Sequence, residues 1–559
     1  MVGVNAKKTE PRQAGIPPKN GVNNDRRTAS RGFGALWFFW LGLVAALREL
    51  FDPMKEKHRG RERETETQKQ SDGAGPPFFF VRMSGTTVSP PAADGSWICQ
   101  AARFASNPFE FLHEQHEKHG DCFTFHLDGC TDPVTAIRGP EAARRLFDAR
   151  ERWVHRFPGP RPAADLVAGN QPVLLFLRGE AHLARKRWWM DLLYGPAAAG
   201  DTGGPSKGLL PDLVARAAPI VRRRLRQCFA SRTGACDVAA ATDELTRDLI
   251  SECLVGLPRS APAMQRMLEQ NDLVSRSLFS VPLDTLPYTG VALTPYSLAK
   301  QARIDINSAL ERLVAETRQK AGGQGQTAAA AAPSMRAGAA RAPGGPPDEV
   351  LAADLGFAIL GALGLSADFS ACLFRLADRA SGAQRAPGPG GRKLRRLLRR
   401  DPAALRSFCL EIRRTFGALA QTNLGLVHKS FAVGDRTVRK GSRVLLSLYE
   451  TNMTTLPDAA AFCPLRFPRA TASGPEPGQD GLYCPMGAGD ARSTHRCLGE
   501  ILRQELLELF VRSVTELRLR YVVAGSEPPV LQDPLVVGHG PAPPLCLRVT
   551  GTATPVPAA

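Results

Sequence analysis

One cysteine of this chain stands where thiolate chemistry is favoured. Cys497 follows a glycine-rich loop and precedes a strongly periodic apolar helix in the stretch PMGAGDARSTHRCLGEILRQELLELF, residues 485–510. At a helix start the thiol meets unpaired backbone N–H groups and the positive end of the helix dipole, with Arg496 beside it, so the pattern favours the thiolate. A thiolate can act as a nucleophile, for which the adjacent His495 is a candidate base. It can equally ligate an iron, with the loop glycines leaving room for a flat macrocycle.

Two patterns upstream favour the ligand over the nucleophile. The sequence EIRR puts Glu411 and Arg414 one helical turn apart, where they can pair on one face of the helix. The sequence FCPLRF follows at 462–467 and contains Arg466. An E-x-x-R pair, an F-x-P-x-R-F stretch and a glycine loop ending in R-C-x-G, in that order before the last long helix, form a specific series.

With this series of motifs, the chain resembles the cytochrome P-450 family of heme-thiolate enzymes over about residues 96–536. The resemblance implies a mainly helical fold with a minor β component in one large domain. It implies that Cys497 is the proximal ligand of heme b, and that Glu411, Arg414 and Arg466 form the buried network that holds the heme-binding loop. The remaining residues that it assigns to the cofactor are His182, Lys186, His495 and Arg496.

The cysteine loop is longer than that of most members of the family. The stretch GAGDARSTHRCLGE is similar to the G-G-G-x(5)-H-R-C-P-G-E loop of bacterial fatty-acid peroxygenases, which use hydrogen peroxide and hold the substrate carboxylate with an Arg-Pro pair on the distal helix. Here Leu360 and Gly361 take the place of that pair, and Leu175 replaces a distal Gln or His. Ser366 and Asp368 are the nearest polar candidates for a catalytic role, and they lie about two helical turns further along the chain than Leu360 and Gly361.

We therefore expect a heme-thiolate oxidase that hydroxylates or otherwise oxidises an apolar lipid or fatty acid, with peroxide or with O2 and electrons from a reductase. The apolar distal helix leaves two alternatives open. One is a lipid-hydroperoxide isomerase or dehydratase, which needs no proton-delivery pair. The other is a heme-binding protein without catalysis.

The charge and the cysteines of the 559-residue chain exclude several other classes. The net charge is +18 and the pI is about 9.7, but acids are interspersed among the Arg and Lys residues and no nucleic-acid-binding motif is present, so we expect no nucleic-acid partner. A basic surface matched to acidic partners or lipid is expected instead. The twelve cysteines show no C-x-x-C spacing, which indicates neither a disulfide framework nor structural zinc; most should be reduced and buried.

The N-terminus resembles a targeting or anchoring segment. Residues 1–31 are basic and expected to be disordered, residues 32–51 are apolar, and residues 52–95 read as a linker. The apolar run is shorter than the roughly 20 residues that span a bilayer comfortably. A signal anchor and an organelle presequence are both compatible with it, and we expect membrane association at the endoplasmic reticulum or in an organelle such as a plastid.

The oxidase domain is expected at 96–546, with a tail at 547–559. Low-complexity insertions without a packing role are expected near 196–208, 321–347 and 381–399. The repeated glycines of a long apolar helix at 350–379 indicate either close helix packing or a flat group near the backbone.

Two shorter stretches also carry predictions. A helix followed by a strand is expected at 108–127, with His113, His116 and His119 fanned over an exposed polar face rather than gathered at a metal. Gly434 and Asp435 indicate the turn of a β-hairpin.

Overall fold

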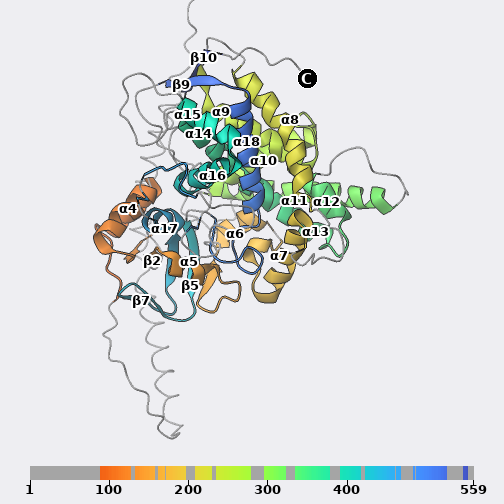
Figure 1. Cartoon of the computed structure of the whole chain (residues 1–559). Helices are drawn as coiled ribbons and strands as arrows, with labels where there is room; N and C mark the ends of the chain where they lie inside the picture. Colours follow the sequence, from red (N-terminus) through yellow and green to blue (C-terminus); the bar gives the residue numbers. More distant parts are fainter. Residues whose placement is uncertain are drawn as a thin grey trace, which may run out of the picture. The chain divides into compact units, whose positions relative to one another are not determined.

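The computed structural model describes residues 89–106, 108–126, 133–157, 161–169, 171–196, 208–229, 235–278, 295–322, 334–377, 391–416, 422–456, 458–459, 461–467, 483–484, 486–524 and 546–551 (Figure 1). All of them belong to one unit of the chain, residues 83–559. The expected N-terminal segments 1–31 and 32–51 and most of the linker lie outside the described residues. Membrane association and localisation therefore stay predictions.

Helices make up most of the described chain. In chain order they are α3 (Trp97–Ser106), α4 (Pro108–His119), α5 (Pro140–Phe147), α6 (Arg161–Ala168), α7 (Gly179–Tyr194), α8 (Leu210–Phe229), α9 (Val238–Leu249), α10 (Pro262–Leu278), α11 (Pro295–Gly322), α12 (Met335–Arg341), α13 (Asp348–Ala362), α14 (Leu365–Leu376), α15 (Gly391–Arg400), α16 (Pro402–Phe416), α17 (Leu448–Thr454) and α18 (Glu500–Glu516). A 3-10 turn, η1 (Leu174–Phe176), precedes α7, and a π-helical turn, η2 (Ile250–Val255), continues α9.

The strands of the described residues form three small sheets. They are β1 (Cys122–Phe125), β2 (Val134–Ile137), β3 (Val154–Phe157), β4 (Ala235–Asp237), β5 (Thr422–Val427), β6 (Phe431–Val433), β7 (Arg436–Val438), β8 (Arg443–Ser447), β9 (Arg520–Ala524) and β10 (Cys546–Gly551). The largest sheet has the order β1-β2-β8-β5-β3, and only β2 and β8 run parallel in it. The expected hairpin is confirmed as β6 and β7, which turn at Gly434 with a φ of 58°. A mainly helical fold with a minor β component is thus confirmed.

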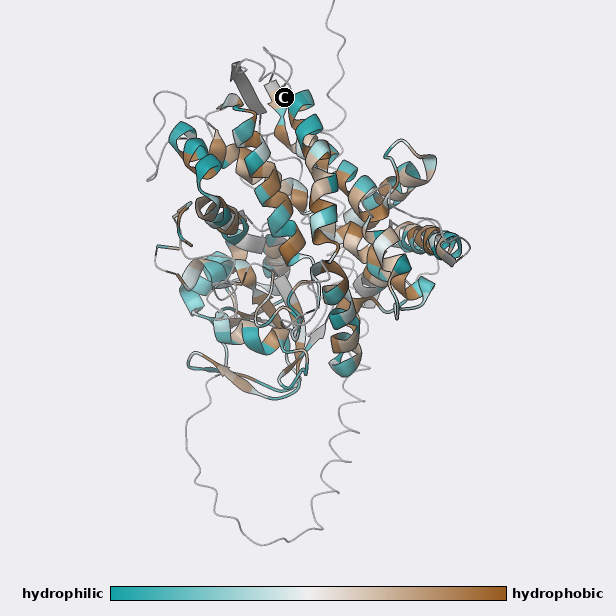
Figure 2. Cartoon of the chain, turned by 45° about the vertical axis from the view of Figure 1, so that its right-hand side comes forward, coloured by the Kyte–Doolittle hydropathy of each residue, from teal (hydrophilic) through white to brown (hydrophobic). Residues whose placement is uncertain are grey.

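The main core lies among the helices. Side chains of α8, α9, α11, α13, α14, α16 and α18 join in one large buried apolar cluster. Phe369 of α14 stacks on Phe510 of α18, with ring centroids 4.4 Å apart. Figure 2 shows brown apolar and teal hydrophilic residues alternating along the helices, as expected of amphipathic helices.

The apolar helix expected at 350–379 is two helices, α13 and α14, that meet at Leu363 and Gly364. Residues 348–376 are long and apolar enough to cross a membrane, yet their buried side chains belong to the main core, as in the core helix of a soluble protein. A Cβ on Gly356 would come 2.9 Å from Asn307 Oδ1 and 3.0 Å from an Arg303 nitrogen. Close packing against α11 therefore explains this glycine.

Two of the three stretches expected to lack a packing role contain helices. In α12, Met335 and Arg336 are buried, and the Arg336 guanidinium donates to the Val255 carbonyl at 2.6 Å. In α15, Leu394 and Leu398 are buried one turn apart. The prediction is wrong for residues 335–341 and 391–399, because apolar side chains at helical spacing outweigh the low-complexity composition around them.

The exposed polar face expected for α4 is wrong for His116. Its side chain is buried, its Nδ1 lies 2.8 Å from the Gly120 carbonyl oxygen, and its ring packs on Phe123 with centroids 4.8 Å apart. Burial, which disfavours the charged imidazole, lowers the pKa of His116 to about 4. This histidine is placed inside because α4 packs against β1.

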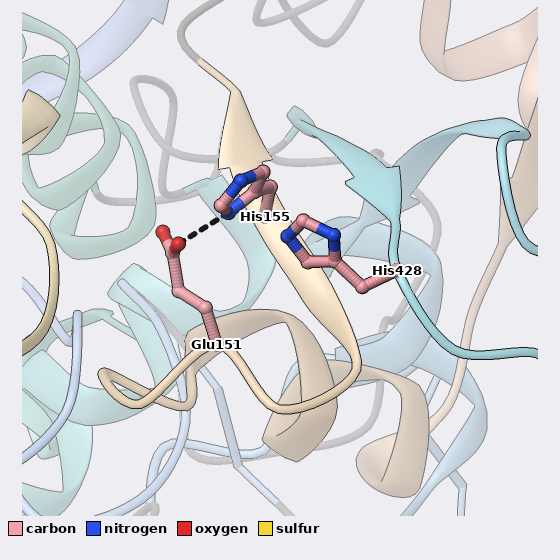
Figure 3. A group of neighbouring side chains, drawn as sticks. All are labelled: Glu151, His155 and His428. Atoms are coloured by element: carbon pink, nitrogen blue, oxygen red, sulfur yellow. Dashed lines mark hydrogen bonds and ion pairs between the residues drawn. The ribbon is translucent and has the colours of Figure 1, made fainter.

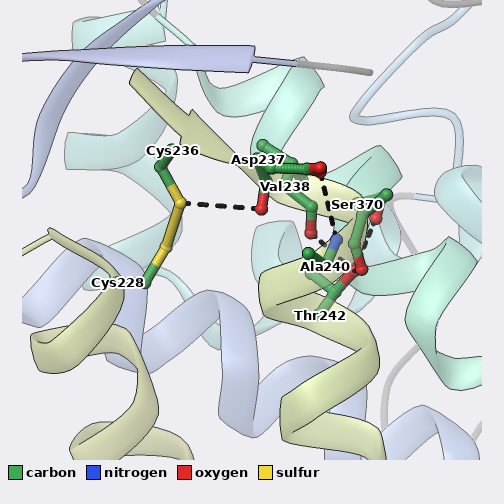
Figure 4. The surroundings of a disulfide bond; sticks show 8 residues. Cys228, Cys236, Asp237, Val238, Ala240, Thr242 and Ser370 are labelled. Carbon is green, nitrogen blue, oxygen red and sulfur yellow. Dashed lines mark hydrogen bonds between the residues drawn. A yellow bond between two sulfur atoms is a disulfide. The ribbon is translucent and has the colours of Figure 1, made fainter. Parts of the chain in front are cut away.

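One cysteine pair is bonded, although no disulfide framework is indicated by the sequence. Cys228 at the end of α8 is linked to Cys236 in β4, with their Cα atoms 6.6 Å apart (Figure 4). Asp237 next to it caps α9 by accepting a hydrogen bond from the Ala240 N–H at 3.1 Å. The expectation of reduced, buried cysteines holds for the described Cys122, Cys253, Cys372, Cys409 and Cys484.

Candidate active site

A tight loop carries Cys497 to the start of α18. Gly487 and Gly489 have φ values of 122° and 87°, which L-residues rarely adopt. A Cβ on Gly487 would lie 2.7 Å from the Phe147 ring and 2.9 Å from the Cα of Arg496. No larger residue fits there, so the loop depends on these glycines for its shape.

A turn around Asp490 stiffens the same loop. The Asp490 carboxylate accepts hydrogen bonds from the N–H of Ser493 at 2.8 Å and from its hydroxyl at 2.7 Å. The Thr494 hydroxyl donates to the Ala488 carbonyl at 3.0 Å. Burial disfavours the charged carboxylate, but the hydrogen bonds outweigh it and hold the pKa of Asp490 below its ordinary value.

Cys497 lies ahead of the helix rather than within it. Its N–H donates to the Met486 carbonyl at 3.1 Å, and α18 begins only at Glu500. Burial, and then the negative charge of Glu500, raise the pKa of the Cys497 thiol, and the Gly499 N–H offsets this only in part. The protein groups around Cys497 therefore do not by themselves favour the thiolate, contrary to the expectation from the sequence. A ferric ion bound to the sulfur would favour the thiolate at this position.

The three residues expected to form a network do come together. Arg414 donates two hydrogen bonds to the Glu411 carboxylate, at 2.7 and 2.8 Å, and Arg466 Nε lies 3.1 Å from the same carboxylate. The Cys463 N–H donates to Glu411 at 2.8 Å. Glu411 and Arg414 are fully buried. The carboxylate thus joins α16 to the segment that contains Arg466.

Asn452 extends this network to the base of the cysteine loop. Arg414 donates to the Asn452 carbonyl at 3.2 Å. The Asn452 side chain donates to the Cys484 carbonyl at 3.0 Å and accepts from the Cys484 N–H at 2.7 Å. The Tyr483 hydroxyl donates to the Leu410 carbonyl in α16 at 2.9 Å. The chain entering the loop is therefore held to α16 by two residues, Asn452 through Arg414 and Tyr483 through Leu410.

Three of the residues assigned to the cofactor also gather at this loop. Lys186 donates to the carbonyls of Thr494 and Arg496, the latter at 2.5 Å, and His182 Nε2 lies 3.4 Å from the Thr494 carbonyl oxygen. The rings of His182 and His495 are 3.9 Å apart between centroids. All three side chains are buried. They tether the loop backbone, and contact with heme propionates stays a prediction.

Arg496 belongs to a buried ion cluster that the sequence analysis missed in part. Its guanidinium donates to Glu500 at 2.6 and 3.0 Å, and Arg413 Nη2 lies 3.0 Å from the same carboxylate. Burial opposes ionisation, but the two arginines outweigh it and lower the pKa of Glu500. The i, i+4 spacing of Arg496 and Glu500 was the available signal, whereas nothing in the sequence pointed to Arg413.

The two polar residues proposed for the distal side are engaged elsewhere. The buried Asp368 carboxylate accepts two hydrogen bonds from Arg503 of α18, at 2.5 and 2.7 Å. The Ser366 hydroxyl lies 3.1 Å from Thr242 Oγ1, which is also 2.8 Å from Ser370 Oγ. These contacts give Asp368 and Ser366 structural roles in joining α14 to α18 and α9.

The described part of α13 carries an apolar surface next to open space. Nothing lies within 4 Å of the point where a Cβ on Gly361 would be, whereas Leu360 is buried in the main core. Leu175 and Phe176 of η1 form a partly buried apolar group with Phe357 of α13. Leu360 and Leu175, two of the three residues at the positions of the peroxygenase Arg-Pro pair and distal Gln or His, thus lie in hydrocarbon surroundings, whereas Gly361 does not.

These features fit a thiolate-bound heme. Cys497 is only partly buried, unlike Cys122, Cys253, Cys372, Cys409 and Cys484, which are buried. Even an added Cβ at Gly499 would stay 4.0 Å from the sulfur. Arg503 donates to the Gly364 carbonyl at 3.4 Å and so ties the helix after the thiol to the end of α13, near the open space at Gly361.

Comparison of the sequence gives no match, whereas comparison of the fold does. No protein-family model matches this sequence, and no curated protein matches it. Among solved structures, a cytochrome P-450 SP alpha variant superposes with a TM-score of 0.58 at 18% identity, covering 81% of this chain and 99% of that chain. Cytochrome P-450 EX alpha with myristic acid gives 0.59 at 18%, covering 82% and 98%.

A variant of cytochrome P-450 OleT in complex with arachidonic acid superposes with a TM-score of 0.61 at 17% identity, covering 84% of this chain and 99% of that chain. These neighbours are fatty-acid peroxygenases, the branch that the cysteine loop resembles. At such low identity the likeness establishes the fold.

Proposed function

We propose, from the premise that this chain has the cytochrome P-450 fold, that it is a heme-thiolate oxidase of an apolar lipid or fatty acid. The observation that carries the proposal is Cys497, a single partly buried thiol on a glycine-shaped loop directly ahead of α18. Heme b bound through this sulfur would supply an electron-rich iron suited to cleaving an O–O bond.

The chain's own residues would prepare the site. The network at Glu411 and Asn452 ties the chain that enters the cysteine loop to α16, which would help to hold the sulfur in position. Leu175, Phe176 and Phe357 offer hydrocarbon contacts to a substrate chain and exclude water from it. Lys186 would keep the loop backbone in place through its two carbonyl contacts.

The substrate class rests on this apolar lining. Myristic acid and arachidonic acid are bound to two of the structural neighbours, which supports a long hydrocarbon chain. Leu360 provides no guanidinium for a carboxylate, and burying an unpaired carboxylate costs several kcal/mol. We therefore expect the polar end of the substrate to lie away from α13.

The oxidant would be peroxide or O2 with a reductase. The surface of helix α15 supports the second alternative, electron supply by a reductase. This helix exposes five cations, Arg392, Lys393, Arg396, Arg399 and Arg400. Such a surface attracts an acidic partner.

A second activity, isomerisation or dehydration of a lipid hydroperoxide, is favoured by the engagement of Asp368. Its carboxylate is paired with Arg503, so it is not available to deliver protons to bound O2. A hydroperoxide substrate already contains the O–O bond and needs no such delivery.

The ligand assignment is tested by a reduced carbon-monoxide difference spectrum of the heme-loaded full chain. We expect the Soret band of thiolate ligation in the unmodified protein and its loss in Cys497→Ala. Cys463→Ala, at an exposed cysteine, is the matched control and should keep the band. A spectrum unchanged by Cys497→Ala would sink the assignment.

Turnover separates the activities. Purified protein is given a fatty acid with hydrogen peroxide, a fatty acid with O2 and reductase, or a fatty-acid hydroperoxide alone. Oxygenated product in either of the first two arms supports the oxidase. Rearranged product in the third arm alone supports the isomerase, and a thiolate spectrum without product in any arm leaves a heme-binding protein.

A further inference from the structure

A histidine pair and a glutamate meet at the edge strand of the five-stranded sheet. Donor atoms of Glu151, His155 and His428 all lie within 4.8 Å of one another (Figure 3). His155 is in β3, opposite Leu426 of β5, and the His428 N–H donates to the Trp153 carbonyl at 2.8 Å. Because side chains two residues apart share a sheet face, both imidazoles lie on one side of the strand pair.

Glu151 has an unusual backbone conformation and a buried side chain, although it lies in a bend of the chain. Its φ is 48°, a left-handed conformation that costs a non-glycine residue free energy and often marks a functional position. Its side chain is 7% exposed. Its Oε2 contacts His155, whereas its Oε1 accepts no hydrogen bond among the described residues and lies 3.9 Å from His495 Nε2. A buried carboxylate oxygen without a donor favours a cation close by.

The two imidazoles are closer than cationic rings would tolerate. Their centroids are 3.5 Å apart, with the ring planes at 70°. Burial, followed by the neighbouring His155, lowers the pKa of His428. Neutral imidazole is the form that ligates metals.

We propose that Glu151, His155 and His428 form a binding site for a divalent metal ion of the zinc class. Two imidazole nitrogens and one carboxylate oxygen are a ligand set that suits Zn²⁺ and leaves its fourth position to water. Purely oxygen-seeking ions such as Mg²⁺ fit this set poorly. None of the three residues is assigned to the heme, but Glu151 borders the proposed heme site because its Oε1 lies 3.9 Å from His495 Nε2.

Arg178 is the competitor of the metal. Its Nη1 lies 3.0 Å from His155 Nε2 and its Nε lies 3.6 Å from Glu151 Oε2. The Arg178 side chain is 51% exposed, so it can swing into water when a metal binds. The guanidinium therefore lowers the affinity without closing the site.

An occupied site would stiffen the strand that supports the cysteine loop. Asp148 forms an isolated bridge with Thr494, and the His495 N–H donates to the Phe147 carbonyl at 2.8 Å. A metal on Glu151 would anchor the segment between these contacts and β3. We expect Zn²⁺ to raise the melting temperature of the heme-loaded protein.

The test is a calorimetric titration of Zn²⁺ into the heme-loaded full chain, purified without a histidine tag and stripped with a chelator. We expect one zinc per chain, and at least about tenfold weaker binding in each of Glu151→Gln, His155→Ala and His428→Ala. His113→Ala, which removes an exposed histidine elsewhere, should leave the affinity unchanged. Arg178→Gln should bind more tightly than the unmodified protein.

Zinc K-edge absorption separates this ion from the heme iron and should report nitrogen and oxygen ligands. The proposal is overturned if the three ligand variants bind Zn²⁺ with the same affinity as the unmodified protein. Sulfur ligation of the zinc, or no zinc binding at all, also overturns it. The Arg178→Gln variant keeps all three ligands, so this test does not depend on whether a ligand variant folds. Zinc binding to Arg178→Gln that is unchanged or weaker than in the unmodified protein also contradicts the proposed site. Because affinity is measured directly, these outcomes are independent of the proposed oxidase activity.

Discussion

The carboxylate of Glu411 and the guanidinium of Arg414 form a two-armed ion pair within α16, at 2.7 and 2.8 Å, with both side chains fully buried. Charges removed from water so completely are tolerated only when they are paired and hydrogen-bonded. Each residue therefore depends on the other. This dependence is what fixes the segment before the cysteine loop to α16.

We expect Glu411→Ala to destabilise the protein by about 3–5 kcal/mol, because it leaves the Arg414 charge buried without a partner. Denaturant unfolding of the heme-loaded protein measures the change. The control is Glu141→Ala, which breaks the pairs of this exposed carboxylate with Arg144 and Arg145 and should cost less than about 1 kcal/mol. Equal effects of the two substitutions would contradict the role given to the network.

His116 should make the protein acid-sensitive. Its pKa is about 4 in the fold against 6.5 for the free side chain, so the unfolded chain binds the proton first as the pH falls. The stability is complete above pH 6.5 and is lost toward pH 4, with a loss of about 2 kcal/mol between pH 6.5 and 5.

Unfolding free energies at pH 7 and pH 5 test this for His116→Gln against the unmodified chain. The variant should lose less stability on acidification, even if it starts from a lower value. His113→Gln, at an exposed histidine, should follow the unmodified protein. A pH dependence that His116→Gln does not alter would rule out this explanation.

Arg303 is a buried cation with no acidic partner among the described residues; its Nη2 donates to the Ala353 carbonyl at 3.3 Å. Burial lowers its pKa to about 10, its side chain is inaccessible, and its Nε and Nη1 have no hydrogen-bond partner in the described part of the chain. We expect Arg303→Met to leave stability unchanged or raise it by up to about 4 kcal/mol. Thermal or denaturant unfolding measures it, with the exposed Arg312→Met in the same helix as control. Destabilisation beyond the control would show that the guanidinium has a favourable role.

The bond between Cys228 and Cys236 closes a short loop and should stabilise the protein by about 2–3 kcal/mol. The double substitution Cys228→Ser and Cys236→Ser should lower stability by that amount and remove the effect of reductant on unfolding. Alkylation of the denatured, unreduced chain should leave these two thiols unmodified. Labelling of both cysteines would show that the bond does not form.

Much of this site could be predicted from the sequence because the motifs that form it are local. The order of Glu411, Arg414, Arg466 and Cys497 along the chain was enough to predict one network and one thiol. The hairpin at Gly434 and the helix ahead of β1 followed from turn residues and periodicity. Such patterns act within a few residues, so they can be read without knowing the fold.

The sequence by itself determined the helical character, the hairpin and the chemical identity of the thiol loop. The tertiary structure alone decided that His116 is buried, that Asp368 pairs with Arg503, and that Glu151 meets His155 and His428. Except for Glu151 and His155, four residues apart, these neighbours come from separate segments of the chain. Burial and pairing of charges depend on which surfaces face each other, and local spacing carries no information about that.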